Sequence, residues 1–137
     1  MEQKVRFYTS SFGIDNYAVS RVIDKAIQIE QQFNGINRIV FIAHTLDNDV
    51  WLESQFGRLG VKKLLKGAKL PNSNATSYFH SKGTYRPRPN DIIITLGLDD
   101  KDVFKIDNGS PSAKAIIAYP GIENGINKWK CNANNID

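Results

Sequence analysis

The sequence predicts a single α/β domain in which a central mixed sheet is flanked by two or three helices. Its 137 residues, 41% of them hydrophobic, are enough for one core and would leave two domains marginal. An alternating β-branched and aromatic stretch at residues 5–8 is followed by a long helical stripe and then by a continuous apolar run at residues 38–43. Strand, helix and buried strand in succession are typical of a βαβ unit.

The first helix is predicted between Asp15 and Gly35. Its apolar side chains recur at helical spacing and share one face: Val19, Val22, Ile23, Ala26 and Ile27. Asp15 can cap the amino end of this helix, and Gly35 can end it. A second helical stretch, over residues 48–66, is interrupted by two glycines. This predicts two short helices joined at Gly57, the second ending at Gly67.

The rest of the chain is predicted to hold further strands, a long loop and a short helix. Strands are expected at residues 91–97, 103–106 and 113–119. Residues 70–90 show no sustained period and contain three prolines, so a long functional loop is expected there; its aromatic residues argue against disorder. The end of the chain is expected to form a short helix around Ile122, Ile126 and Trp129, followed by a frayed tail at residues 131–137.

The net charge, the single cysteine and the length of the apolar runs indicate which kinds of partner and which cell compartment to expect. The net charge is +4, which favours anionic partners but is lower than dedicated DNA-binding domains usually carry. The single cysteine, Cys131, has no partner for a disulfide. The longest apolar run, residues 39–43, is far shorter than the roughly 20 residues that span a bilayer, and the first residues lack the pattern of a secretion signal. We therefore expect a cytoplasmic protein outside the membrane.

Known catalytic motifs are absent from the sequence, which has no Walker-type loop, GxGxxG, GxSxG or HExxH. We therefore predict a binding protein that is not an enzyme, with no cofactor and no metal. An alternative remains open, because His44, Asp47 and Asp49 follow the buried strand and could hold a divalent ion in a small nucleotide hydrolase or nuclease. The simpler interpretation is that Asp47 or Asn48 caps the next helix.

Residues 78–90 carry the predicted ligand site. Arg86 and Arg88 alternate with prolines, which hold the backbone extended and project both guanidinium groups toward phosphates that they can grip bidentately. Several aromatic residues of the segment offer flat faces on which a purine could stack: Tyr78, Phe79, His80 and Tyr85. The alternative is a surface loop whose aromatic side chains anchor it to the core.

A second basic group lies on the glycine-interrupted helical stretch: Arg58, Lys62, Lys63, Lys66 and Lys69. Spacings of four place Arg58, Lys62 and Lys66 on one face if the helix continues through Gly60. This face could be merely solvated, or it could make the protein a nucleic-acid-binding module, a second alternative function. The turn at residues 10–13 could likewise receive an anion at the start of the first helix, or be an ordinary strand-to-helix turn.

The chain also resembles a known family. The elements that carry the resemblance are a first strand leading to a long amphipathic helix, a buried strand, Phe56-Gly57-Arg58, Ser77-Tyr78-Phe79, Pro89-Asn90-Asp91 and the closing segment of residues 115–120. In length and order these elements are similar to those of the small phage anti-Thoeris sponge proteins, over most of the chain.

The resemblance implies a function. Proteins of that family sequester cyclic ADP-ribose isomers made by TIR-domain enzymes of bacterial immunity, without cleaving them, so that the downstream effector stays inactive. They assemble as dimers or larger oligomers, and some bind cyclic oligonucleotides at separate sites. For this chain the resemblance implies a homo-oligomeric phage protein in the host bacterial cytoplasm, with no membrane or nucleic-acid partner. Arg58 would contact phosphate, Phe79 adenine, and Asn90 polar groups of the ligand.

Overall fold

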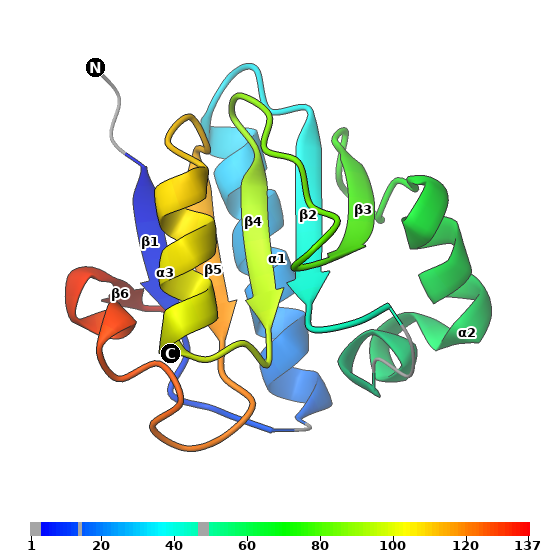
Figure 1. Ribbon diagram of the computed structural model, residues 1–137. Coiled ribbons are helices and arrows are strands. Elements are labelled where there is room, and N and C mark those ends of the chain that lie inside the picture. Colours follow the sequence, from blue (N-terminus) through cyan, green and yellow to red (C-terminus); the bar gives the residue numbers. More distant parts are fainter. Residues whose placement is uncertain (1–3, 14, 47–49) are drawn as a thin grey trace.

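The computed structural model of the protein describes residues 4–13, 15–46 and 50–137 (Figure 1). Its strands are β1 (Val5–Tyr8), β2 (Arg38–Ala43), β3 (Thr76–Ser81), β4 (Ile92–Leu96), β5 (Ala115–Tyr119) and β6 (Asn134–Asn135). Its helices are α1 (Asn16–Gln32), α2 (Val50–Lys66), α3 (Asp100–Gly109) and the short 3₁₀ helix η1 (Trp129–Asn132). The α/β class and the central sheet flanked by helices are confirmed.

One six-stranded sheet runs through the domain in the order β3-β2-β4-β5-β1-β6. All of these neighbours pair in parallel, which corrects the expectation of a mixed sheet. In the described part of the chain the only antiparallel pairing is an isolated bridge between Ala68 and Ser77. The sheet is parallel because each strand is joined to the next by a crossover rather than by a tight hairpin, whether that crossover is helical or extended.

The two faces of the sheet are covered by different elements (Figure 1). On β2, Ile39, Phe41 and Ala43 pack in the core with α1 and α2, while Val40 and Ile42 pack in a second core with α3 and η1. This strand is buried on both faces, as its continuous apolar sequence predicts. We call the first face the α1 face and the second the α3 face.

The connections reverse direction at the middle of the sheet. If β2, β3, β4 and β5 are numbered 1 to 4 in chain order, they lie in the sheet in the order 2-1-3-4, and β1 lies beside them in the fifth place. The order 2-1-3-4-5 is common in doubly wound sheets. The connection after β2 runs to the α1 face, and that after β4 runs to the α3 face. Ligands of open α/β sheets bind outside the carboxyl ends of strands at such a reversal.

The start of α1 and the break in α2 are as predicted. The Asp15 side chain accepts a hydrogen bond from the backbone N–H of Ala18 and caps α1. Gly57 has non-helical dihedral angles (φ 71°, ψ 171°), so α2 consists of two helical pieces joined there. The caps proposed at Asp47 or Asn48 lie outside the described residues.

Three expectations for the second half of the chain are wrong. Residues 103–106 belong to α3 rather than to a strand, because Val103 and Ile106 are buried three residues apart while Phe104 faces outward. The expected long loop contains β3, whose pairing with β2 adds an edge strand to the sheet. The expected frayed tail instead forms η1 and β6, and β6 pairs with β1.

Candidate functional site

A groove of about 520 Å³ lies on the α3 face, between α3 and the segment of residues 82–87 that leaves β3. Tyr85, Pro87 and Ile106 form its apolar surface. Three lysines also line it: Lys82, Lys101 and Lys105. An apolar surface beside several cations fits a ligand that has both a flat apolar part and negative charge.

The lysines reach the groove from two elements. Lys101 and Lys105 are one helical turn apart on α3 and therefore share a face, while Lys82 follows the carboxyl end of β3. Lys82 Nζ lies 3.0 Å from Asp102 Oδ2, and His44 Nδ1 lies 3.9 Å from the same oxygen. Lys101 and Lys105 form no ion pair with any residue that the structure describes. The groove therefore carries positive charge that is only partly balanced.

The end of the groove near Lys82 and Asp102 lies at the carboxyl edge of the sheet, where the connections between strands reverse direction. His44 follows β2, Lys82 follows β3, and Asp102 lies in the first turn of the helix that follows β4. The ion pair of Asp102 with Lys82 and the approach of His44 to the same carboxylate join the three elements at the carboxyl edge. The groove thus begins where the topology of the sheet predicts a ligand site, and it extends along α3.

A buried carboxylate fixes the segment that forms one side of the groove. The side chain of Asp91 is 1% exposed and accepts hydrogen bonds from Arg38 Nε (2.9 Å), Arg38 Nη2 (2.6 Å), the Tyr85 hydroxyl (2.7 Å) and the Arg88 backbone N–H (3.0 Å). Arg38 also donates to the Arg86 carbonyl at 3.0 Å. Residues 85–91 are therefore held against β2, and Tyr85 has a fixed position before any ligand binds.

Burial and the hydrogen bond to Asp91 keep the Tyr85 phenol neutral to a higher pH than an exposed tyrosine. Burial raises the pKa of its phenol, and the hydrogen bond to the Asp91 carboxylate raises it further. The hydrogen bond to Asp91 also raises the pKa of Arg38 above its ordinary value. At neutral pH Tyr85 is therefore a neutral donor to Asp91, and its ring is presented to the groove as an apolar surface.

Three rings form an aromatic row beside this segment. Tyr78 and His80 stack at a centroid distance of 6.1 Å, and His80 lies 6.3 Å from Tyr85. The Arg38 guanidinium lies over Tyr78 at 5.5 Å and over Tyr85 at 6.0 Å. Burial lowers the pKa of His80, and the positive charge of Arg38 lowers it further, which favours a neutral imidazole. Three of the four aromatic residues expected near the ligand are thus grouped, although only Tyr85 lines the groove.

The predicted ligand residues of this segment have different positions. Tyr85 lines the groove, but the exposed Arg86 and Arg88 do not. The Arg86 guanidinium folds back and donates to the carbonyls of Tyr85 (3.1 Å) and Gly83 (3.4 Å), which corrects the expectation that it projects outward. Asn90 lies in the turn before β4, at the amino end of the strand, where its amide approaches the Gly35 carbonyl at 3.5 Å.

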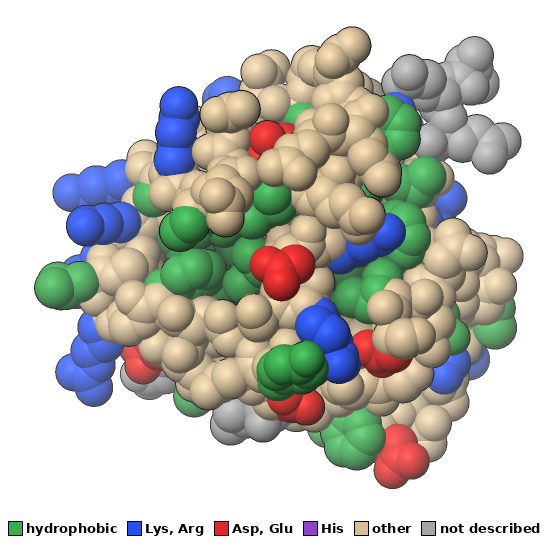
Figure 2. Space-filling model, turned by 180° about the vertical axis from the view of Figure 1, so that it is seen from behind, with side chains coloured by type: hydrophobic (Ala, Val, Ile, Leu, Met, Phe, Trp, Pro, Cys, Tyr) green, Lys and Arg blue, Asp and Glu red, His purple; other side chains and the backbone are tan. Residues whose placement is uncertain are grey.

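Arg58 and Phe79 lie away from the groove. Phe79 is 1% exposed and packs in the core of the α1 face, because neighbouring residues of β3 alternate between the two faces of the sheet. A ligand cannot stack on it without opening the core. Arg58 is exposed on α2, and the helix continues through Gly60, so Arg58, Lys62 and Lys66 share the expected basic face. Figure 2 shows basic side chains gathered along the side of the molecule formed by α2.

The sequence interpretation missed the three groove lysines. Lys101 and Lys105 are spaced like neighbours on a helix, but this signal is lost if residues 103–106 are taken as a strand. For the metal hypothesis, Asp47 and Asp49 lie outside the described residues, and His44 is half exposed beside Asp102. Among the residues that the structure describes, no group of three metal-ligating side chains comes together.

The described helices include none that is both long enough and apolar enough to span a membrane. Comparison of the chain with protein-family models, with curated proteins and with solved structures finds no match.

Proposed function

We propose that this protein binds a small phosphorylated, nucleotide-like ligand in the groove between α3 and residues 82–87, and holds it without transforming it. The observation that carries the proposal is a pair of lysines, Lys101 and Lys105, that form no ion pair within the described part of the chain. They lie beside the apolar surface of the groove, formed by Tyr85, Pro87 and Ile106. A volume of about 520 Å³ is suited to a ligand of nucleotide size, because such sites usually measure roughly 300–1,000 Å³.

The charges of the groove favour a ligand with two phosphates. Lys82 is offset by Asp102, which leaves Lys101 and Lys105 as two cations for a diphosphate. Hydrogen bonds to charged groups contribute about 1.5–3 kcal/mol each when they replace contacts with water, with less expected for exposed lysines. Burial of the base or ribose on the apolar surface would supply the rest of the affinity.

Binding without catalysis fits the groups that line the groove. A nucleophile needs activation, commonly by a base that accepts its proton. The Tyr85 hydroxyl donates its proton to Asp91, whose carboxylate is itself bound by Arg38, and the Lys82 ammonium lies on Asp102. The groove therefore offers cations and apolar surface, which suit retention of a ligand.

The identity of the ligand is a finer proposal. It rests on the resemblance to anti-Thoeris sponge proteins in the order of elements alone, because the contact residues that the resemblance implies, Arg58, Phe79 and Asn90, do not line the groove. On that basis we propose a cyclic ADP-ribose isomer as the ligand, and sequestration in the cytoplasm of an infected bacterium as the role. A homo-oligomer, and a second site for cyclic oligonucleotides, belong to the same proposal.

The test combines calorimetric titration with thermal unfolding, using cyclic ADP-ribose isomers, ADP-ribose, NAD and cyclic oligonucleotides. The groove variant is Lys101→Glu with Lys105→Glu. The matched control is Lys62→Glu with Lys66→Glu, which has the same spacing and charge change on α2. A ligand at about 100 times its Kd adds roughly 2.7 kcal/mol of stability, and this should raise Tm by several degrees.

We expect the groove variant to lose at least tenfold in affinity and the control to bind as the wild type does. Heating the complex should release the ligand chemically unchanged. Release of a cleaved product would identify an enzyme instead. Equal binding by the wild type and the groove variant, or no binding of any nucleotide, would refute the proposal.

A further inference from the structure

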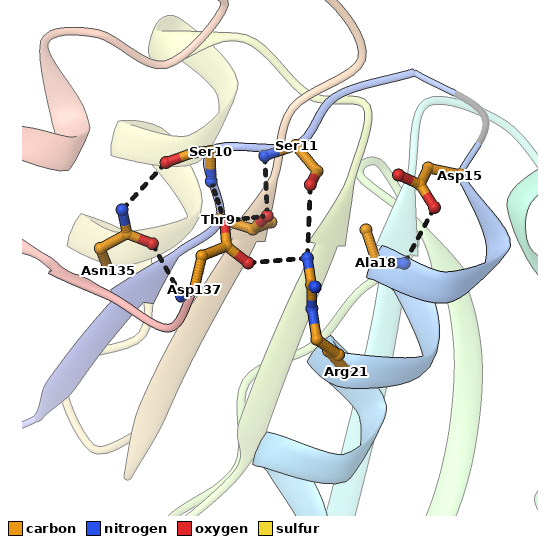
Figure 3. A network of polar contacts seen from close by, with 8 residues as sticks. All are labelled: Thr9, Ser10, Ser11, Asp15, Ala18, Arg21, Asn135 and Asp137. Carbon is orange, nitrogen blue, oxygen red and sulfur yellow. Dashed lines mark hydrogen bonds and ion pairs between the residues drawn. The ribbon is translucent and has the colours of Figure 1, made fainter.

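The carboxylate of Asp137 fills the turn that follows β1 (Figure 3). Its Oδ2 accepts hydrogen bonds from the Ser10 backbone N–H at 2.6 Å and from the Thr9 hydroxyl at 3.1 Å. Its Oδ1 accepts from Arg21 Nη2 at 2.8 Å. A backbone N–H, a hydroxyl and a guanidinium thus converge on one anion, and all three belong to β1, its turn or α1.

Two of these donors, Thr9 and Arg21, also make contacts that do not involve Asp137. The residue Thr9 is 2% exposed, and its hydroxyl oxygen accepts from the Ser11 N–H at 2.9 Å, which directs its proton toward Asp137. Arg21 Nη2 also donates to the Ser11 hydroxyl at 3.4 Å, and Arg21 Nε is buried without a hydrogen-bond partner among the described residues. Asp15 separately caps α1. The arrangement is therefore preorganised for an anion and does not depend on the helix terminus.

The segment that carries Asp137 is joined to the rest of the protein mainly at the edge of the sheet. It consists of the two-residue strand β6 at the edge of the sheet, whose residues are exposed. One further backbone bond joins Ile136 N–H to the Tyr8 carbonyl, and the Asn135 amide donates to the Ser10 hydroxyl. The Ile136 side chain is only partly buried where it packs against the core of the α1 face, so this segment can open locally at less cost than the central strands.

The turn is also placed like a ligand site. It lies at the carboxyl edge between β1 and β5, where the following segments leave toward opposite faces of the sheet. A pocket of about 190 Å³ adjoins it, and its lining includes Thr9, Ser10, one cation, Lys130, and one carboxylate, Glu123. Two of the three donors, Thr9 and Ser10, thus border a space for the rest of a ligand.

We propose that this turn is a phosphate-binding site, and that the Asp137 carboxylate is an internal ligand that a phosphate group displaces. A phosphate has the negative charge and the oxygen acceptors of a carboxylate. It carries more charge at pH 7 and three terminal oxygens as an ester, or four as the free ion, so the same donors can bind it. The site is separate from the groove on α3, and the two proposals can fail independently.

The experiment compares the full-length wild type with Asp137→Asn by calorimetric titration with inorganic phosphate at pH 7. Glu53→Gln on α2 is the control for loss of one negative charge. Asp137→Asn combined with Arg21→Gln removes both the internal ligand and a donor. Adenosine monophosphate is the second titrant, because it shows whether the neighbouring pocket accepts the ester group. Amide NMR of Ser10 follows the site directly and verifies that each variant is folded.

We expect Asp137→Asn to bind phosphate at least tenfold more tightly than the wild type, and the Ser10 amide to shift on substitution and to shift back as phosphate binds. Glu53→Gln should match the wild type, and the added Arg21→Gln should abolish the gain. Tighter binding of adenosine monophosphate would indicate a phosphate ester as ligand, and equal binding the phosphate ion; both support the site. Unchanged affinity in Asp137→Asn, or a gain that survives Arg21→Gln, would overturn the proposal.

Discussion

Asp107 on α3 supports a prediction about the dependence of stability on pH. Its side chain is 7% exposed and accepts hydrogen bonds from Lys4 Nζ (2.8 Å), Arg6 Nε (2.7 Å) and Trp129 Nε1 (2.9 Å). Burial alone would raise the pKa of this carboxyl, but the hydrogen bonds from Arg6, Lys4 and Trp129 outweigh it and lower the pKa from 3.8 to about 2. The ionised carboxylate therefore joins α3 to β1 and η1.

The magnitude follows from this shift. At about 1.4 kcal/mol for each pKa unit, the shift of Asp107 means that its ionisation contributes about 2.5 kcal/mol to the free energy of unfolding above pH 5. Because the folded pKa is depressed, this contribution is fully present above the unfolded pKa and is lost as the pH falls toward 2. Replacement of Asp107 by Asn should cost about 3 kcal/mol at pH 7, because two cations lose a buried partner.

The assay is urea unfolding of the wild type and Asp107→Asn at pH 7, 5, 3 and 2, followed by tryptophan fluorescence. We expect the stability difference between the two proteins to shrink by about 2 kcal/mol between pH 5 and pH 2. Asp24→Asn, which removes an exposed carboxylate on α1, controls for the change in net charge. A difference that stays constant over this range, or grows as the pH falls, would refute the reasoning.

Three further predictions concern backbone strain and buried hydroxyls. Gly97→Ala should destabilise the protein by roughly 2 kcal/mol or more, because φ is +75° and the new Cβ would meet Trp51 at 2.7 Å; Gly109→Ala, with open space around it, should be nearly neutral in the same urea assay. Tyr85→Phe should cost about 1–2 kcal/mol and speed amide hydrogen exchange in residues 85–91, whereas unchanged exchange would show that the bond to Asp91 does not order this segment. Burial raises the pKa of Tyr119 to about 12, so stability should fall as the pH rises from 10 to 12, and Tyr119→Phe should weaken that fall.

Continuous burial made the first half of the fold predictable. In α1 the apolar stripe packs along its length against the sheet, and β2 is buried on both faces, so their sequences show the helical period and the apolar run clearly. In α3 only Val103, Ile106 and Asp107 are buried in ten residues, which is too little to display a helical period. The strand β3 lies at the edge of the sheet and mixes buried with half-buried residues, so its sequence shows no clear apolar run either.

The candidate site was predictable only in part. The aromatic residues of segment 78–90 argued against disorder, the segment is ordered, and Tyr85 lines the groove. What orders them is Asp91 paired with Arg38, 53 residues earlier in the chain, and no local pattern reveals such a pairing. The direction of Phe79 depended on recognising β3, and the cationic side of the groove depended on recognising α3. Contacts between segments far apart in the sequence therefore decided which side chains line the groove.

The most direct measurement of the central claim is an amide NMR titration of the wild-type protein with cyclic ADP-ribose and with ADP-ribose. If the groove on α3 binds the nucleotide, the largest and saturable shifts should fall on Gly83, Lys101, Lys105 and Gly109, which line it on both sides. The amide chemical shifts of the basic face of α2, formed by Arg58, Lys62 and Lys66, should not change. Shifts confined to α2 or to the turn after β1, or no saturable shift with either nucleotide, would contradict the account.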